Sequence, residues 1–136
     1  MAVELTEKVR AFLRERRFVV LATLNTDGSP QLTTMWYLLE DDGTIMMNTK
    51  VGRVKERNLR RDSRISICIE DGYHYLTISG RVEMIDEPEI AQRDIFRLAT
   101  RYNGAENAKR QMEKQFSKEQ RVTLRLKPEH IIEKFD

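Results

Sequence analysis

Tight turns between strand-like segments constrain the fold of this chain more than any other feature of its sequence. Asn25-Thr26-Asp27-Gly28, Asp41-Asp42-Gly43 and Asp71-Gly72 each interrupt an apolar or alternating stretch with residues that favour β-turns. About seven short strands joined by hairpins indicate a small antiparallel barrel, because closure of the sheet removes its exposed edges. The strand-like segments are residues 18–24, 30–39, 44–49, 65–70, 73–85, 122–126 and 131–135, the last two around Lys127-Pro128.

Helical patterns lie between these strands and do not form a separate block. Apolar residues at helical spacing predict an amphipathic helix over residues 4–16. Further helices are expected from near Gly52, from an N-cap at Asp86 to Gly104, and over residues 105–116. A chain of 136 residues is most simply one domain with one core. The predicted fold class is therefore mainly β with flanking helices (α+β), as a single domain over residues 1–136.

A glycine turn separates the end of a predicted strand from the start of a basic helix. Residues 50–64 contain seven Lys or Arg and two acids, a local balance of +5, whereas the remaining 17 basic and 20 acidic residues balance to −3. A helix start offers unpaired backbone N–H groups and a partial positive charge, to which Arg53 and Lys55 would add two full charges. Cations there are unfavourable without a partner, so the junction predicts an anion site, with the Thr49 hydroxyl as a further donor.

Two other interpretations of the basic segment stay open. A run of charges is commonly a solvated helix face, and a basic helix can also bind the phosphates of nucleic acid. Nucleic acid is disfavoured because residues 50–64 contain no aromatic side chain to stack on bases. Met35-Trp36-Tyr37 can form a wall for a flat ring, or Trp36 can belong to the core, since only the fold decides which face of that strand is buried.

The residues needed for several other activities are missing or isolated. There is no Gly-x-Ser-x-Gly or Gly-x-Gly-x-x-Gly motif, the Asp-Gly turns lack calcium-ligand spacing, and His74 and His130 have no obvious partner. His130 is expected in a Pro-containing turn. The single cysteine, Cys68, excludes an intrachain disulfide and is expected to be a small buried hydrophobe in the apolar alternation of residues 65–69. The longest apolar stretch is residues 18–22 and no signal peptide is visible, so we expect a cytoplasmic protein that does not enter a membrane and holds no metal.

Two motifs in a fixed order carry a resemblance to a known family. They are Phe18-Val19-Val20-Leu21-Ala22-Thr23-Leu24-x-x-Asp27-Gly28-x-Pro30 and Asn48-Thr49-x-x-Gly52-Arg53-x-Lys55-x-Arg57-Asn58-Leu59. The ensemble resembles the pyridoxamine 5′-phosphate oxidase-like split-barrel superfamily, and within it the coenzyme F420 (deazaflavin)-dependent oxidoreductases. The resemblance covers nearly the whole chain and implies a split antiparallel β-barrel of the FMN-binding type.

The resemblance also implies a homodimer with a flat redox cofactor at each subunit interface. The expected activity is hydride transfer from reduced coenzyme F420 to a conjugated, electron-poor small molecule, with no catalytic side chain required. The phosphate-bearing arm would meet Asn48, Thr49, Gly52, Arg53, Val54 and Lys55. The ring would lie along Thr33, Thr34, Met35 and Trp36, with Thr77 and Ser79 of the partner subunit as the other wall.

Two departures from the flavin-using oxidases bear on the cofactor. Residues 31–39 contain no basic side chain, and residues 124–130 do not reproduce the Arg-x-His pattern that binds substrate in those enzymes. Vitamin oxidase activity is therefore disfavoured. An FMN-binding oxidoreductase or flavin carrier of the same fold is the alternative, because both cofactors carry a phosphate, and a nucleic-acid-binding module is the alternative of another class.

Overall fold

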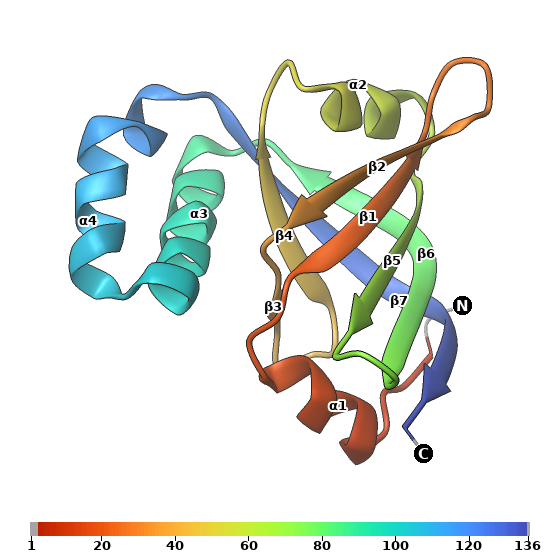
Figure 1. Cartoon of the computed structure of the whole chain (residues 1–136). Helices are drawn as coiled ribbons and strands as arrows, with labels where there is room; N and C mark the ends of the chain where they lie inside the picture. The colour runs from red at the N-terminus through yellow and green to blue at the C-terminus, as the bar shows by residue number, and fades with distance from the viewer. Residues whose placement is uncertain (1–2, 136) are drawn as a thin grey trace.

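One antiparallel sheet of seven strands forms the body of the protein in the computed structural model, which describes residues 3–135 (Figure 1). The order of strands across the sheet is β2-β1-β5-β6-β7-β4-β3. The edge strands β2 and β3 follow each other in the chain with only Trp36 and Tyr37 between them, so the sheet curls until its two edges meet. This confirms the predicted split barrel. The strands are β1 (Val19–Leu24), β2 (Pro30–Met35), β3 (Leu38–Leu39), β4 (Ile45–Lys50), β5 (Arg64–Glu70), β6 (Tyr75–Ile85) and β7 (Arg121–Lys134).

The inner face of the barrel holds the main core. Burial alternates along β5 and β6, as the period-two spacing predicts. Apolar side chains removed from water in this way are the main driving force for the barrel. Those from β1, β5 and β6 that are at most 3% exposed are Val19, Leu21, Ile65, Ile67, Ile69, Leu76 and Ile78.

Within the described residues, four α-helices surround the barrel: α1 (Glu7–Arg14), α2 (Val54–Arg61), α3 (Pro88–Asn103) and α4 (Ala105–Lys114), followed by the 3₁₀ turn η1 (Phe116–Lys118). Figure 1 shows α1 across one end of the barrel, α2 over the other end, and the α3–α4 hairpin on one side. The hairpin packs on Met46 of β4 through a second core cluster that includes Ile95, Leu98 and Phe116. None of the helices in residues 3–135 is long and apolar enough to cross a membrane.

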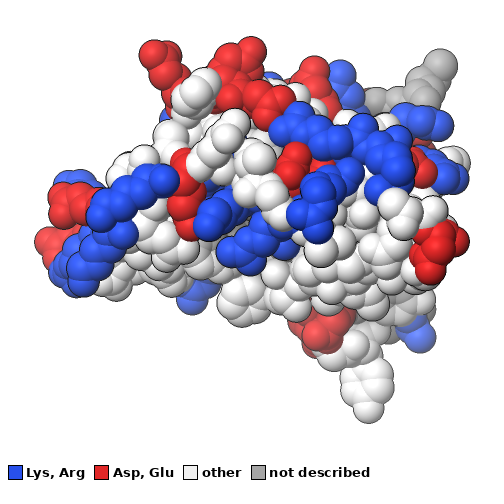
Figure 2. Space-filling view, turned by 90° about the horizontal axis from the view of Figure 1, so that it is seen from above, with Lys and Arg blue, Asp and Glu red and all other residues white. Residues whose placement is uncertain are grey.

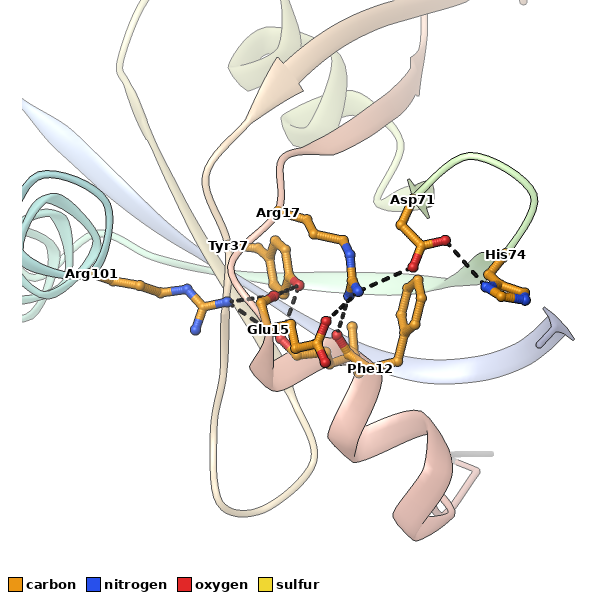
Figure 3. A network of polar contacts seen from close by, with 8 residues as sticks. Phe12, Glu15, Arg17, Tyr37, Asp71, His74 and Arg101 are labelled. Carbon is orange, nitrogen blue, oxygen red and sulfur yellow. Dashed lines mark hydrogen bonds and ion pairs between the residues drawn. The ribbon is translucent and has the colours of Figure 1, made fainter. Parts of the chain in front are cut away.

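The end of the barrel under α1 is closed by polar contacts to the barrel wall (Figure 3). The Tyr37 hydroxyl lies 2.9 Å from the carbonyl oxygen of Leu13 and 3.0 Å from that of Glu15. Arg101 donates to the same two carbonyl oxygens at 3.3 and 3.2 Å. Burial raises the pKa of Tyr37 to about 12. These contacts tie the last turn of α1 to both the sheet and α3.

Arg17 extends this network to the turn between β5 and β6. Its guanidinium lies 4.0 Å from the centroid of the Phe12 ring, donates to Glu15 at 2.5 Å, and reaches Asp71 at 3.4 Å. His74 lies 3.5 Å from the other carboxylate oxygen of Asp71 (Figure 3). No partner for His74 was obvious in the sequence, and the hairpin turn supplies Asp71, while His74 stays an exposed turn residue as expected.

Two strand boundaries differ from the sequence prediction. The segment 30–39 is not one strand, because the chain bends at Trp36 and Tyr37 to pass from one sheet edge to the other. The two strands expected around Lys127-Pro128 form the single strand β7, and His130 lies within it, not in a turn. Pro128 is tolerated there because it faces the register shift at Ser79/Gly80, where the regular ladder is already interrupted.

Four further local predictions need correction. Helix α1 begins at Glu7 and ends at Arg14, within the predicted 4–16, and α2 begins at Val54. The N-cap of α3 is Glu87, since the Asp86 carboxylate is held by Arg60 at 2.6 and 2.8 Å. Cys68 is half-buried on the outer face of β5, because the buried isoleucines on either side of it point inward.

Candidate functional site

A cavity of about 370 Å³ lies between β4, the end of β2, the start of α2 and the α3–η1 side of the molecule. Its walls come from segments that are far apart in the sequence and that the barrel brings together. Seven of the residues predicted for the site line it: Thr34, Met35, Trp36, Asn48, Thr49, Arg53 and Lys55. Phe18, Ile95, Leu98, Gln115, Phe116 and Arg121 complete the lining.

Arg53, Lys55 and Arg121 give the cavity a positive end. Burial lowers the pKa of Lys55, and the charges of Arg53 and Arg121 lower it further. Burial also lowers the pKa of Arg121, although the hydrogen bond to Glu119 opposes this. Neither Arg53 nor Lys55 has an ion-pair partner within residues 3–135, where Arg121 and Lys50 share Glu119. Cations crowded in a partly dry site, with one shared carboxylate between them, favour a bound anion.

The start of α2 is partly capped from within the protein. Gly52 has a φ of +102°, which favours glycine, and the turn places Arg53 at the N-cap. The Gly52 N–H donates to Glu56 at 2.8 Å, and Arg60 donates to the same carboxylate at 2.8 Å. Burial alone would raise the pKa of Glu56, but these hydrogen bonds lower it. Gly52 and Val54, which were predicted for the site, do not line the cavity. The positive charge of the cavity therefore comes mainly from side chains, and less from the backbone N–H groups at the start of α2 that the sequence suggested.

Other basic residues of the 50–64 segment are engaged within the protein. Arg60 is paired with Asp86, and Arg64 donates to Asp62 at 2.7 Å, which lowers the pKa of that carboxyl to about 2. Arg61 donates to a backbone carbonyl at the end of β1. Figure 2, viewed from the α2 end, accordingly shows Lys and Arg side chains with acidic ones among them. The segment is not one uniform cationic face.

Aromatic rings form the apolar part of the cavity, and one of them, Phe116, lies beside Arg121. Trp36 stacks on Tyr102 with centroids 5.3 Å apart, and it meets Phe116 edge-on at 6.5 Å. Phe18 stacks against Tyr102 at 5.6 Å and is 60% exposed. Tyr37 points into the barrel core, whereas Trp36 lies outside it and lines the cavity. The sequence left both positions for Trp36 open, and the structure places its ring on the wall.

Three further residues predicted for the site do not line this cavity. Thr33 does not line the cavity, and its buried hydroxyl has no hydrogen-bond partner among the described residues. Thr77 and Ser79 alternate with the buried residues of β6 and so face outward. Ser79 lines a separate cavity of about 400 Å³, together with Ser66 and His130. Within one chain, these two outward residues therefore lie apart from the cationic cavity.

Five of the six lining residues that the sequence did not reveal come from the second half of the chain, and the sixth is Phe18. Ile95 and Leu98 belong to the apolar stripe of α3, and such a stripe predicts burial without saying that it also faces a cavity. Arg121 faces the site because it pairs with Lys50 in the β4–β7 ladder, a register that no local pattern predicts. Among residues 3–135, no three His, Cys, Asp or Glu side chains gather as a possible metal site.

Comparison with known proteins places this fold and cavity in a family. The family described as pyridoxamine 5′-phosphate oxidase matches residues 5–135. A conserved hypothetical protein from Mycobacterium tuberculosis is 31% identical, with a TM-score of 0.81 over 97% of this chain and 85% of the other. The fold is also similar to that of an F420 reductase (23% identity, TM-score 0.75, 94% of this chain and 98% of the other). It is likewise similar to HutZ, a heme storage protein from Vibrio cholerae (20% identity, TM-score 0.71, 96% and 95%). The chain therefore belongs to the pyridoxamine 5′-phosphate oxidase family of split-barrel proteins.

Proposed function

We propose that the protein is a coenzyme F420 (deazaflavin)-dependent oxidoreductase that reduces conjugated, electron-poor small molecules. When bound, the cofactor would supply a hydride to an electron-poor carbon of a double bond, and a proton from water would complete the reduction. The residues of this chain bind the phosphate-bearing arm, orient the ring against the substrate and limit the access of water. These tasks need no acid or base among the side chains of the cavity.

The polarity of the cavity is the observation that carries this proposal. Arg53 and Lys55 at one end lack ion-pair partners in the described chain, while Trp36, Phe18 and Phe116 offer aromatic surface elsewhere in the same cavity. Charged donors suit a phosphate, and aromatic walls suit a flat ring, so the cavity fits one molecule that carries both groups. The similarity in fold to an F420 reductase supports the choice of cofactor.

The functional unit in this proposal is a homodimer. The outer face of the sheet and its margin expose Phe18, Val20, Leu32 and Ile132 by 41–63% of their surface. Large apolar surfaces of this kind mark contact sites, and a second copy of the chain is the occupant we propose. Such packing would bring Thr77 and Ser79 of the partner subunit to the cofactor. Light scattering after gel filtration should give about twice the chain mass of 16.1 kDa, and a monomer at micromolar concentration would contradict the dimer.

An FMN-binding oxidoreductase or flavin carrier is the second candidate. A phosphomonoester carries about −1.5 to −2 charges at neutral pH, which matches the two cations Arg53 and Lys55. A nucleic-acid-binding module has less support, because Arg60, Arg61 and Arg64 are engaged in contacts within the chain. The deazaflavin remains the preferred cofactor because residues 31–39, beside the expected ring, contain no basic side chain.

Titration of the purified protein with coenzyme F420, FMN and a random-sequence oligonucleotide separates these three functions. The proposal predicts the tightest binding for F420, followed by oxidation of reduced F420 when a conjugated, electron-poor acceptor is added. Preferential binding of FMN would establish the second candidate. Tight oligonucleotide binding that weakens steeply with salt would establish the third. The absorbance of protein purified from its native cell provides an independent identification of a bound chromophore.

A further inference from the structure

We propose that Arg121 is a third anion-binding residue of the cavity, which contacts a phosphoryl oxygen of the ligand together with Arg53 and Lys55. The inference rests on the proposed function, since it concerns the same site. It assigns a role to a residue that enters the site only through the tertiary structure.

The guanidinium of Arg121 is held so that part of it stays available. Its side chain is only 9% exposed, and it lines the cavity. Nε donates to Asn48 Oδ1 at 2.8 Å, Nη1 donates to Glu119 at 2.6 Å, and the Phe116 ring centroid lies 5.0 Å from the guanidinium carbon. Within residues 3–135, Nη2 has no hydrogen-bond partner. An arginine anchored through Nε and Nη1, with the Nη2 donors left over, can bind an oxyanion.

A buried chain of hydrogen bonds fixes this orientation. The Asn48 amide donates to the Ala91 carbonyl oxygen at 2.9 Å and lies 3.3 Å from the Thr123 hydroxyl. Thr123 donates in turn to Asp94 at 2.9 Å, and Asn48, Thr123 and Asp94 are at most 5% exposed. Asn48 was predicted to bind the cofactor, but its amide is occupied within the fold. We therefore assign Asn48 as a positioning residue that sets the direction of Arg121.

The charge balance of the cavity indicates what Arg121 binds. Glu119 is the carboxylate paired with Arg121, and it is shared with Lys50 at 3.8 Å. Arg53 and Lys55 have no such partner in the described chain, so the positive end carries an excess of about two charges. A phosphoryl group shares its negative charge over two or three non-bridging oxygens and can accept from several cationic donors at once. Burial of Lys55 and Arg121 strengthens their contacts, because less water competes for the anion there, whereas Arg53 is exposed.

Arg121→Gln is the test, with Arg121→Lys as the conservative variant and Lys109→Gln as the control. Lys109 is exposed on α4 and does not line the cavity, so its loss matches the change in charge alone. Isothermal titration with F420, FMN, inorganic phosphate and pyrophosphate gives the affinities. We expect Arg121→Gln to raise Kd at least tenfold for the cofactor that binds wild type, Arg121→Lys to recover part of the loss, and Lys109→Gln to stay within twofold. Wild-type affinity in Arg121→Gln would overturn the inference.

Two measurements separate a binding role from a structural one. Because the charge of Arg121 lowers the pKa of Lys55, Arg121→Gln should raise that pKa in the free protein, as followed by NMR of the lysine side chain. In the wild-type protein, the Arg121 Nε–H resonance should shift with the same phosphate midpoint as Lys55, even if the variant fails to fold. A shift of Lys55 without one of Arg121 would overturn the inference and leave the proposed function intact. Phosphate-dependent shifts of both residues, in a protein that binds neither cofactor, would support the inference and reject the proposed function.

Discussion

Replacing Lys55 by methionine should weaken cofactor binding and, at the same time, stabilise the free protein. Lys55 lines the cavity, has no ion-pair partner within residues 3–135, and has its pKa lowered by burial and by Arg53 and Arg121. Methionine keeps a flexible chain of similar length and removes the charge. The two opposite effects follow from one cause, because a cation placed to meet an anion is unfavourable until the anion arrives.

The expected sizes follow from the chemistry of the contact. A hydrogen bond to a charged group contributes about 1.5–3 kcal/mol, so Kd for the phosphate-bearing cofactor should rise about 10- to 150-fold. In the free protein, relief of repulsion among three cations should stabilise the fold by about 0.5–1 kcal/mol. For a domain of this size, that corresponds to a rise in Tm of about 2–4 °C.

Fluorescence titration of the cofactor and thermal unfolding of the free protein measure the two effects separately. Lys109→Met is the matched control, since Lys109 is exposed on α4 away from the cavity lining, and it should change neither quantity beyond error. Unchanged cofactor affinity in Lys55→Met would remove this residue from the site. Loss of both affinity and stability would show that the side chain supports the fold, which would refute the argument from uncompensated charge.

Three more outcomes follow from the same structure. The pKa of Lys55 lies below its ordinary value of 10.5, so its charge destabilises the folded protein at pH values below the lowered pKa, and this destabilisation decreases as pH rises towards 10.5. Phosphate affinity, measured by titration calorimetry, should fall over the same pH range because Lys55 loses its proton, and the profile should be flatter in Lys55→Met. The pKa of Tyr37 is raised from 10.0 to about 12, so its stabilising effect is complete below pH 10 and is lost towards pH 12. Tyr37→Phe should cost about 1–2 kcal/mol at pH 8, should lose less stability than wild type between pH 9 and 12, and is checked by urea unfolding. Gly80→Ala should cost about 1–3 kcal/mol, because the new Cβ would clash with the Lys127 carbonyl oxygen; an unchanged urea midpoint would contradict this.

Much of the fold could be predicted because its signals are local. Turn residues and period-two alternation indicated the strands, and Gly104 was correctly expected to end α3. The errors lie where a distant partner decided the local structure. Asp86 was predicted as an N-cap, but Arg60 holds its carboxylate, and Pro128 was expected to break a strand that continues because the partner strand is irregular at that point.

The candidate site likewise combines residues that local sequence signals identified with residues that only distant contacts placed there. The glycine turn and the basic start of α2 are consecutive in the chain, so Arg53 and Lys55 could be proposed as anion-binding residues from sequence alone. The side on which Trp36 lies could not be predicted, because alternation gives two faces without saying which one is buried. Curling of the sheet decided it, since the bend between the two edge strands turns Tyr37 inward and leaves Trp36 on the cavity wall.

The sequence by itself determined the short-range features: the hairpin turns, the end of α3 at Gly104 and the cluster of positive charge after β4. Only the tertiary structure decided which of those charges share a cavity and what they face. Arg121 stands opposite Lys50 through the β4–β7 register, and Asn48 turns its amide towards buried partners that belong to α3 and β7. Interactions within a few residues are encoded by neighbours in the chain, whereas pairing between distant strands depends on how the whole sheet closes.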